Sequence, residues 1–309
     1  MNYGKRSTSK KQKSMHSKSA KAGKKASVIF IKAFLVCLLA AGVIGLCAGI
    51  GIVKGVIDNA PDIDSTSVIP RGYKSVMVDS DGNKMAELIT AGSNRVWVDI
   101  DNIPEHVQKA FVDVEDERFY EHNGIDLKGI VRAGVKGIAS GFKKTEGAST
   151  ITQQLLKNSV FDFMSEDTLV EKIERKLQEQ YLALELEKIM TKDEILEAYL
   201  NTINLGQNTL GIQAAANRYF NKDVSELTIS EAAVIAGITK SPTKYNPVTD
   251  PEENAKRRDI VLEDMKKCGD ISEEEYQEAM ADDVYDRIQT TNETKSSASV
   301  YSYYVAATI

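Results

Sequence analysis

The stretch AFLVCLLAAGVIGLCAGIGIV, residues 33–53, runs for 21 residues without a charged side chain. About 20 apolar residues are what a helix needs to cross the hydrocarbon core of a bilayer. A cleaved signal peptide has a shorter apolar run and a small-residue cleavage site, and GIVKGVIDNAPDID at the end of this run offers no obvious one. The stretch therefore predicts a retained transmembrane anchor, which we place at residues 28–53.

Charge differs between the two sides of the anchor. Residues 1–27 contain nine Lys or Arg and no acidic residue, and the rest of the chain has 30 basic against 45 acidic residues. A basic flank stays in the cytoplasm, so residues from about 54 onward are expected outside the membrane. The tail has no interleaved aromatic residues, which favours anionic lipid and membrane topology over nucleic acid as the reason for its charge.

Beyond the anchor the pattern changes from extended to helical. YKSVMVDSDGNKMAELI alternates in hydropathy on both sides of residues 80–83, which predicts a β-hairpin, and NRVWVDI at 94–100 is expected to add a third short strand. From Pro104 to about Glu278 the pattern is helical, with capping-box spacings that begin at Thr191, Thr228 and Ser272.

The chain is therefore expected to be mainly α. Cys37 and Cys47 lie in the anchor and only Cys268 lies outside it, so the outer domain must be held by its core rather than by a disulfide. We divide the chain into a basic cytoplasmic tail (1–27), the anchor (28–53), a stalk (54–72), a folded domain (73–265), and a helical segment with a polar linker that begins an unfinished C-terminal region (266–309).

The first candidate for chemistry is a single acidic residue on an apolar helical face. In the helix after Pro104, one stripe recurs every four residues: Val107, Phe111, Glu115 and Phe119. The neighbouring acidic residues face elsewhere and are expected to be solvated: Asp116, Glu117 and Glu121. A carboxylate between two phenyl rings loses hydration in its charged form, which suits it to proton transfer. The alternative is a Glu at the rim of the stripe, or one paired with a distant cation.

The second candidate is the start of a helix within KKTEGASTITQQLLKN, residues 143–158. Gly147 permits a bend, and Thr150 with Gln153 has capping-box spacing, so a helix is expected to begin near Ser149. The free amides of a helix N-terminus suit an anion such as phosphate, and Lys157 lies two turns further on. A well-capped surface helix is the alternative.

The third candidate is EKIERKLQEQYLALELEK, residues 171–188. Its predicted core stripe is Leu169, Ile173, Leu177, Tyr181 and Leu184. A charged side is formed by Lys172, Arg175, Lys176 and Glu179. Two adjacent cations beside one acid could hold a pyrophosphate while the acid orders them; the alternative is a solvated, salt-bridged face.

These segments together resemble the peptidoglycan glycosyltransferase (transglycosylase) domain of class A penicillin-binding proteins and of monofunctional peptidoglycan glycosyltransferases. Five ordered motifs carry the resemblance: E-D-x-x-F-x-x-H-x-G at 115–124, G-x-S-T-I-T-Q-Q at 147–154, R-K-x-x-E at 175–179, K-x-x-I-L-E-x-Y-L-N at 192–201 and G-I-x-x-A-A-x-x-Y-F at 211–220. They cover roughly residues 70–265 and are far more specific together than singly. One departure is Asn221, where many relatives have Gly; Asn tolerates the left-handed conformation well.

The resemblance implies a lysozyme-like helical glycosyltransferase domain at 73–265, with a smaller membrane-proximal lobe. It also implies an inverting, processive reaction in which the growing glycan-lipid is the donor and lipid II the acceptor. The products would be β-1,4-linked glycan strands and undecaprenyl pyrophosphate. The location implied is the bacterial cell membrane, with a cytoplasmic N-terminus, an extracytoplasmic catalytic domain, and cell-wall synthesis proteins as further partners.

By the same resemblance, Glu115 is the general base that deprotonates the acceptor hydroxyl. Glu179 would position the donor pyrophosphate, often with a divalent metal such as Mg²⁺, and no organic cofactor is implied. Substrate contacts are expected from the second and third motifs: Ser149, Thr150, Gln153, Gln154, Lys157, Arg175 and Lys176. His122 is expected to be structural, bonded near the turn at 123–124, because the three His have no metal-ligand spacing.

Three other functions are compatible with parts of the sequence. A lysozyme-like enzyme that cleaves glycan also uses an isolated Glu, but it needs no cations for a pyrophosphate and no anchor. The S-x-x-K pattern of penicillin-binding serines occurs at residues 241–244 without an S-x-N or K-T-G partner, and we interpret it as a chance match. An inactive scaffold that recruits cell-wall partners would not need its matched catalytic positions, which are all intact.

Overall fold

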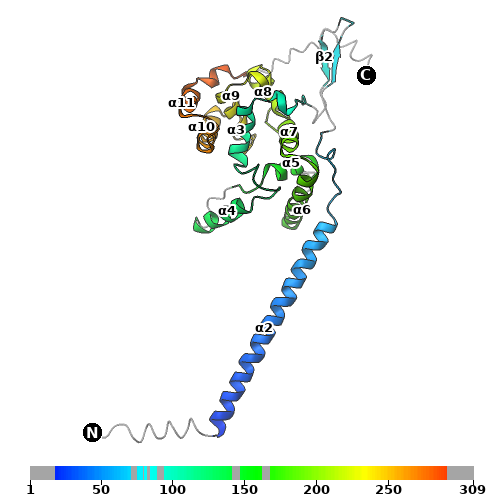
Figure 1. Ribbon diagram of the computed structural model, residues 1–309, viewed down its shortest axis with the longest axis vertical. Coiled ribbons are helices and arrows are strands. Elements are labelled where there is room, and N and C mark those ends of the chain that lie inside the picture. Colours follow the sequence, from blue (N-terminus) through cyan, green and yellow to red (C-terminus); the bar gives the residue numbers. More distant parts are fainter. Residues whose placement is uncertain are drawn as a thin grey trace, which may run out of the picture. The chain divides into compact units, whose positions relative to one another are not determined.

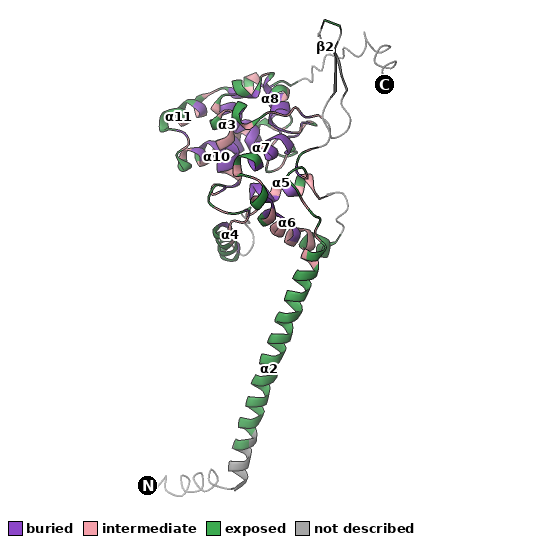
Figure 2. Cartoon of the chain, turned by 45° about the vertical axis from the view of Figure 1, so that its right-hand side comes forward, coloured by how far each residue is buried: buried purple, intermediate pink, exposed green. Residues whose placement is uncertain are grey.

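The computed structural model describes residues 18–70, 75–78, 80–81, 84–88, 94–140, 147–161 and 168–290. Contacts along the backbone divide the chain into two compact units, Met1–Asn59 and Ala60–Ile309. The first unit contains one unbroken helix, α2 (Lys18–Asp58), drawn in blue in Figure 1. Its part from Ser27 to Asp58 is long and apolar enough to cross a membrane, and it is exposed except near its C-terminal end, where Val56 and Ile57 are half-buried (Figure 2). A helix that is apolar on every side needs an apolar environment on every side.

The second unit is mainly helical, as predicted. Its helices in the described ranges are α3 (Glu105–Glu115), α4 (Leu127–Ala139), α5 (Ile151–Ser159), α6 (Leu169–Ile189), α7 (Lys192–Thr202), α8 (Ile212–Phe220), α9 (Ile229–Ile238), α10 (Pro251–Cys268) and α11 (Glu273–Ala281). Short 3₁₀ turns lie at Ile100–Asn102, Val224–Glu226 and Val284–Arg287.

Helix α9 forms the centre of one group of helices. Its sequence ISEAAVIAGI is apolar on almost every face, and each residue from Ser230 to Ile238 is buried. Helices α3 and α10 pack against it, together with α8 and α11. Gly237 permits the close approach of α10, because a Cβ there would lie 3.2 Å from Cγ of Arg257. A second group is formed by α5, which packs on both α6 and α7.

The helix starts follow the predicted capping chemistry. The capping boxes that begin at Thr191, Thr228 and Ser272 all form, with the Glu side chain accepting from the N-cap amide in each. Thr150 caps α5 by accepting from the amide of Gln153, but the side chain of Gln153 is turned elsewhere, so the reciprocal half is missing. Asn221 ends α8 in the left-handed conformation (φ 52°), which Asn tolerates well.

The predicted hairpin is present as β1 (Ser75–Val78) and β2 (Lys84–Leu88). The two strands are antiparallel, with Ser75 opposite Leu88 and an irregularity between Met77 and Val78. The third strand, expected at 94–100, does not form: residues 94–99 are in no strand and Ile100 begins a 3₁₀ turn.

The segment at 94–100 fails to form a strand because α7 side chains satisfy its backbone. The side-chain oxygen of Asn201 accepts from the amide of Val98 at 2.9 Å, and its amide nitrogen donates to the carbonyl of Val98 at 2.8 Å. Glu197 accepts from the amide of Ile100 at 2.7 Å.

The predicted core stripe of α6 is correct only for Tyr181, which is partly buried against the core, and is wrong for three of its five residues. Leu169 and Ile173 are exposed (74% and 54%), and Leu184 is 40% exposed. The buried face is instead Gln178, Glu179, Leu182, Ala183 and Leu186. Helical spacing fixes which residues share a face, but the neighbours α5 and the loop at Gly124 decide which face is covered.

Candidate active site

A charged cavity of about 510 Å³ opens beside the end of α3. Its wall also includes the residues that follow α3, parts of α4 and α10, and the segment before α5. More than half of the lining residues are charged: Asp113, Glu115, Asp116, Glu117, Arg118, Asp126, Arg132, Lys136, Lys240, Arg257, Asp264 and Lys267. A concave site with cations and carboxylates suits an anionic substrate whose reaction moves a proton.

Glu115 is the last residue of α3 and lines this cavity. Its Oε2 accepts a hydrogen bond from Nε2 of Gln154 at 2.8 Å, and its Oε1 accepts from the hydroxyl of Thr239 at 2.5 Å. The buried Tyr199 holds Gln154 in turn, because its hydroxyl donates to Oε1 of Gln154 at 3.3 Å. Both carboxylate oxygens therefore accept hydrogen bonds.

The apolar stripe describes the surroundings of Glu115 only in part. Val107 and Phe111 are buried on α3, but the helix ends at Glu115, so Phe119 does not lie one helical turn further on. Phe119 is nevertheless fully buried, in the turn that follows. The hydrogen-bond partners of Glu115 come from α5 and from the end of α9, which spacing within one helix could not indicate.

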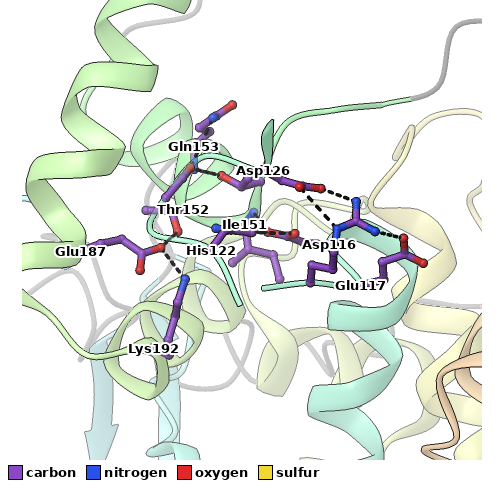
Figure 3. A network of polar contacts seen from close by, with 12 residues as sticks. Asp116, Glu117, His122, Asp126, Ile151, Thr152, Gln153, Glu187 and Lys192 are labelled. Carbon is purple, nitrogen blue, oxygen red and sulfur yellow. Dashed lines mark hydrogen bonds and ion pairs between the residues drawn. The ribbon is translucent and has the colours of Figure 1, made fainter. Parts of the chain in front are cut away.

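Asp116 directly follows α3 as its C-cap and joins this helix to the start of α5. Its backbone leaves the helical region (φ −158°, ψ 68°) and its carboxylate turns inward. One oxygen accepts from the amide of Ile151 at 3.0 Å, and Nε2 of His122 lies 3.0 Å from both oxygens (Figure 3). The carboxylate thus occupies the N-terminus of α5, where free amides favour an anion.

Two predictions for the first motif are settled by this arrangement. Asp116 is buried rather than solvated, so that prediction is wrong, whereas Glu121 is exposed as expected. His122 has a structural contact, as predicted, but its partner is Asp116 and not the turn at 123–124.

Gly124 positions the second motif. Its φ is +83°, and a Cβ there would lie 2.5 Å from the carbonyl oxygen of Ala183 in α6, so only Gly fits. Its own carbonyl accepts from the hydroxyl of Thr150 at 2.8 Å and from Nε2 of Gln153 at 3.4 Å. The structure therefore buries Thr150 and Gln153 and gives their side chains partners within the protein.

The cations of R-K-x-x-E surround a buried acid. Glu179 is 1% exposed, so the solvated face that would be the ordinary alternative is excluded. Its Oε1 is bonded to Arg175, and its Oε2 accepts from Nζ of Lys176 at 2.9 Å. Burial, and then the charges of Arg175 and Lys157, lower the pKa of Lys176 to about 8. A further anion beside Lys176, in addition to Glu179, would favour its charged form.

Ser149 connects the cation cluster to the cavity. Its hydroxyl accepts from Nζ of Lys176 at 2.7 Å, and the residue itself lines the cavity. Among the predicted site residues, Glu115, Ser149, Thr150 and Gln154 line this one cavity. The others do not line it and instead form a cluster around Lys176, which contacts the lining residue Ser149: Gln153, Lys157, Arg175, Lys176 and Glu179.

The cavity also holds cations that the sequence motifs did not indicate. They come from four separate segments: Arg118, Arg132, Lys136, Lys240, Arg257 and Lys267. Glu117 bonds to three of them, and hydrogen bonds from Lys267 and Arg132 hold its pKa at about 2. Arg257 is 7% exposed, and its Nε has no hydrogen-bond partner within the described ranges. Arg132 and Lys136 are one helical turn apart on α4, but no spacing along the chain joins the four segments, so no local pattern could group all six cations.

The surroundings of Glu179 do not fit a metal ion. Both of its oxygens bond to cations, Arg175 and Lys176. Within the described ranges there is no group of three His, Cys, Asp or Glu that could hold a metal. Hard divalent cations need several oxygen ligands, so one carboxylate between two cations does not supply a site. The predicted involvement of Mg²⁺ stays a prediction, and we derive no step from it.

Comparison with known proteins gives a consistent set of relatives. The family model described as "Transglycosylase" matches residues 81–266. Penicillin-binding protein 1A of Clostridium perfringens strain 13 is 39% identical over 289 residues, which are 91% of this chain and 41% of that protein.

Two proteins of Bacillus subtilis strain 168 are similar as well. Penicillin-binding protein 1A/1B is 39% identical over 307 residues (98% of this chain, 32% of that protein), and penicillin-binding protein 1F is 46% identical over 201 residues (65% and 27%). The chain thus spans less than half the length of these curated relatives.

Proposed function

Because the chain belongs to the transglycosylase family found in penicillin-binding proteins, we propose that it is a peptidoglycan glycosyltransferase that polymerises lipid II. The growing glycan-lipid is the donor, lipid II is the acceptor, and undecaprenyl pyrophosphate is the leaving group. The observation that carries this proposal is the position of Glu115 in a cavity that Ser149 joins to the Lys176 cluster. A proton acceptor and cations for a phosphate leaving group are the two requirements of such a transfer.

Glu115 acts as the general base in this proposal. As the acceptor hydroxyl attacks the anomeric carbon of the donor, its O–H bond breaks and the proton goes to the carboxylate. The attack comes from the face opposite the pyrophosphate, so the configuration inverts and a β-1,4 linkage results. Gln154 and Thr239 fix the carboxylate through its two oxygens, which supports its role because a base must be aimed at the proton it takes.

The cations beside α5 stabilise the leaving group. Breaking the bond from the anomeric carbon to oxygen leaves its electron pair on the pyrophosphate, whose negative charge increases. Arg175 and Lys157 lie close enough to Lys176 for their charges to lower its pKa, and charge-assisted hydrogen bonds to phosphate oxygens are strong. Glu179 holds Arg175 and Lys176 in place from its buried position, and so positions the groups that hold the pyrophosphate.

A membrane location follows from the substrate and is supported by two features. Helix α2 is long and apolar enough to anchor the chain, and the basic residues before it favour a cytoplasmic N-terminus. In the second unit, α4 exposes a stripe of apolar side chains, Leu127, Val131, Val135 and Ile138. An exposed apolar helix face suits contact with lipid. We propose an extracytoplasmic catalytic domain on the outer face of a bacterial cell membrane.

The test is polymerisation of labelled lipid II by the purified chain, wild type beside Glu115→Gln. The amide keeps the shape of the side chain but cannot take the proton, so we expect a loss of at least about 100-fold, the usual contribution of a general base. Glu121→Gln is the matched control, since Glu121 is exposed. Near-normal polymer from Glu115→Gln would contradict the assignment. Fragments from preformed glycan, instead of polymer, would indicate the lysozyme-like reaction, and no turnover would indicate a scaffold. Parallel reactions with magnesium and with a chelator test the metal.

A further inference from the structure

Thr239 contacts Glu115 from outside the five motifs. It lies at the C-terminal end of α9, and its Oγ1 is 2.5 Å from Oε1 of Glu115 and 2.7 Å from the carbonyl oxygen of Ala236. A carboxylate oxygen and a carbonyl oxygen both accept hydrogen bonds. A hydroxyl has one proton, so Thr239 can donate to only one of these two oxygens at a time.

The partner of the other carboxylate oxygen cannot change its role. Oε2 of Glu115 faces Nε2 of Gln154, an amide nitrogen that only donates. The hydroxyl of Tyr199 donates to the oxygen of the same amide, which fixes its orientation. Once Glu115 carries a proton, the neighbour that can accept it is therefore the hydroxyl of Thr239.

We propose that Thr239 is a positioning residue whose hydroxyl proton changes partner during the reaction. The inference rests on the proposed function, with Glu115 as general base. While Glu115 is ionised, Thr239 donates to its Oε1. After Glu115 has taken the proton of the acceptor hydroxyl, Oε1–H donates to Oγ1 of Thr239, and the proton of Thr239 turns to the carbonyl of Ala236. The electron pair released by the acceptor O–H bond forms the new glycosidic bond, and that of the broken bond leaves with the pyrophosphate.

This switch keeps every group hydrogen-bonded in both states of Glu115. It requires two rotations of hydroxyl hydrogens, that of the new O–H about the Cδ–Oε1 bond of Glu115 and that of Thr239 about its Cβ–Oγ1 bond. No heavy atom has to move, because both acceptors already lie within 2.7 Å of Oγ1. The bond to the ionised carboxylate is charge-assisted and therefore the stronger of the two alternatives. Thr239 thus stabilises the ionised base, and it still offers the protonated acid an acceptor.

The test uses two variants that separate the hydroxyl from the methyl group. Thr239→Val keeps the shape and removes the hydroxyl, whereas Thr239→Ser keeps the hydroxyl and removes the methyl. For Thr239→Val we expect kcat/KM for lipid II to fall roughly tenfold, the effect of losing one hydrogen bond to a charged group. The acid limb of its pH profile should move up by about one pH unit, because the ionised base has lost a donor. Thr239→Ser should stay close to wild type in both respects.

Several results would overturn the inference. An acid limb of Thr239→Val that coincides with that of wild type would do so, and so would a Thr239→Ser variant as impaired as Thr239→Val, since packing would then explain the effect. Thermal unfolding of each variant is measured alongside. Thr239→Ala serves if the Val variant unfolds, and it should show the same displaced limb. Wild-type protein that makes no polymer would instead overturn the proposed function itself.

Discussion

Lys176 is a lysine whose surroundings oppose its charge. It lies beside Arg175 and Lys157, and burial and these charges lower its pKa to about 8. Its Nζ nevertheless donates hydrogen bonds to side-chain oxygens of Ser149, Gln153 and Glu179. A cation held in this way is oriented before a substrate arrives, which reduces the entropy lost when a phosphate binds. It also implies that the binding site loses a positive charge when the pH rises above about 8.

We expect an alkaline limb near pH 8 in the kcat/KM profile of the wild type, because kcat/KM reports groups of the free enzyme. Lys176→Arg should move this limb to higher pH, since a guanidinium stays protonated, although its larger head group should lower the maximum. Lys188→Arg, on the exposed end of the same helix, is the matched control and should leave the limb in place. A limb that stays near pH 8 in Lys176→Arg would assign it to another group.

At the scale of elements, the site depends on how α3, α5 and α6 meet. Asp116 places a carboxylate at the N-terminus of α5, and Gly124 brings its loop against the backbone of α6. Both lie within nine residues of Glu115, so the first motif encodes the contacts between helices as well as the base. From the sequence alone such a motif is interpreted as a set of catalytic residues, although Asp116 and Gly124 hold helices together.

Gly124→Ala tests this contact between elements. The φ of Gly124 is +83°, which side chains disfavour, and a Cβ added there would lie 2.5 Å from the carbonyl oxygen of Ala183. We expect the free energy of unfolding to fall by about 2–4 kcal/mol, from backbone strain and displacement of α6. Chemical denaturation measures it. Gly134→Ala is the control, because its Cβ meets nothing within 4 Å in α4 and should stabilise the helix by about 0.5–1 kcal/mol. Equal stability of both variants would contradict the packing described for Gly124.

At the scale of the whole molecule, the surfaces of the two units favour different environments. Helix α2 is apolar and exposed along most of its length, whereas the Ala60–Ile309 unit buries its apolar residues around α9. Because the Ala60–Ile309 unit has a single cysteine, its stability comes from this core and from buried polar groups. One such group, Asp113 on α3, should couple the stability of the whole unit to pH.

Asp113 is buried, and burial followed by the charge of Asp270 raises its pKa to about 7. Lys109, which pairs with Asp270 at 2.8 Å, and the thiol of Cys268 are its other polar neighbours. The folded chain therefore binds a proton here that the unfolded chain releases near pH 4, so the free energy of unfolding should fall as the pH rises from about 4 to 7. In wild type the free energy of unfolding should therefore be lower at pH 8 than at pH 5. We expect Asp113→Asn to reduce this difference in unfolding free energy by roughly 2 kcal/mol.

Denaturant unfolding at the two pH values measures this difference. Asp101→Asn, at an exposed position, is the matched control and should leave it unchanged. If Asp113→Asn shows the same loss of stability between pH 5 and pH 8 as wild type, Asp113 is not the group responsible.

Local patterns in the sequence determined the features that depend on neighbouring residues. The uncharged run at 33–53, the capping boxes at Thr191, Thr228 and Ser272, and the hairpin around residues 80–83 each involve contacts a few residues apart. Hydropathy and hydrogen-bonding capacity act over that range, so the chain itself specifies them. The five motifs in order were enough to indicate the family.

Tertiary structure decided which of these residues meet. The face of α6 that is buried contains Glu179, because Arg175 and Lys176 neutralise it there and α5 covers it. Thr239 reaches Glu115 across 124 residues of chain, and Arg257 enters the same cavity from α10. Such contacts follow from how helices pack and not from spacing within any one helix, so only the folded chain shows them.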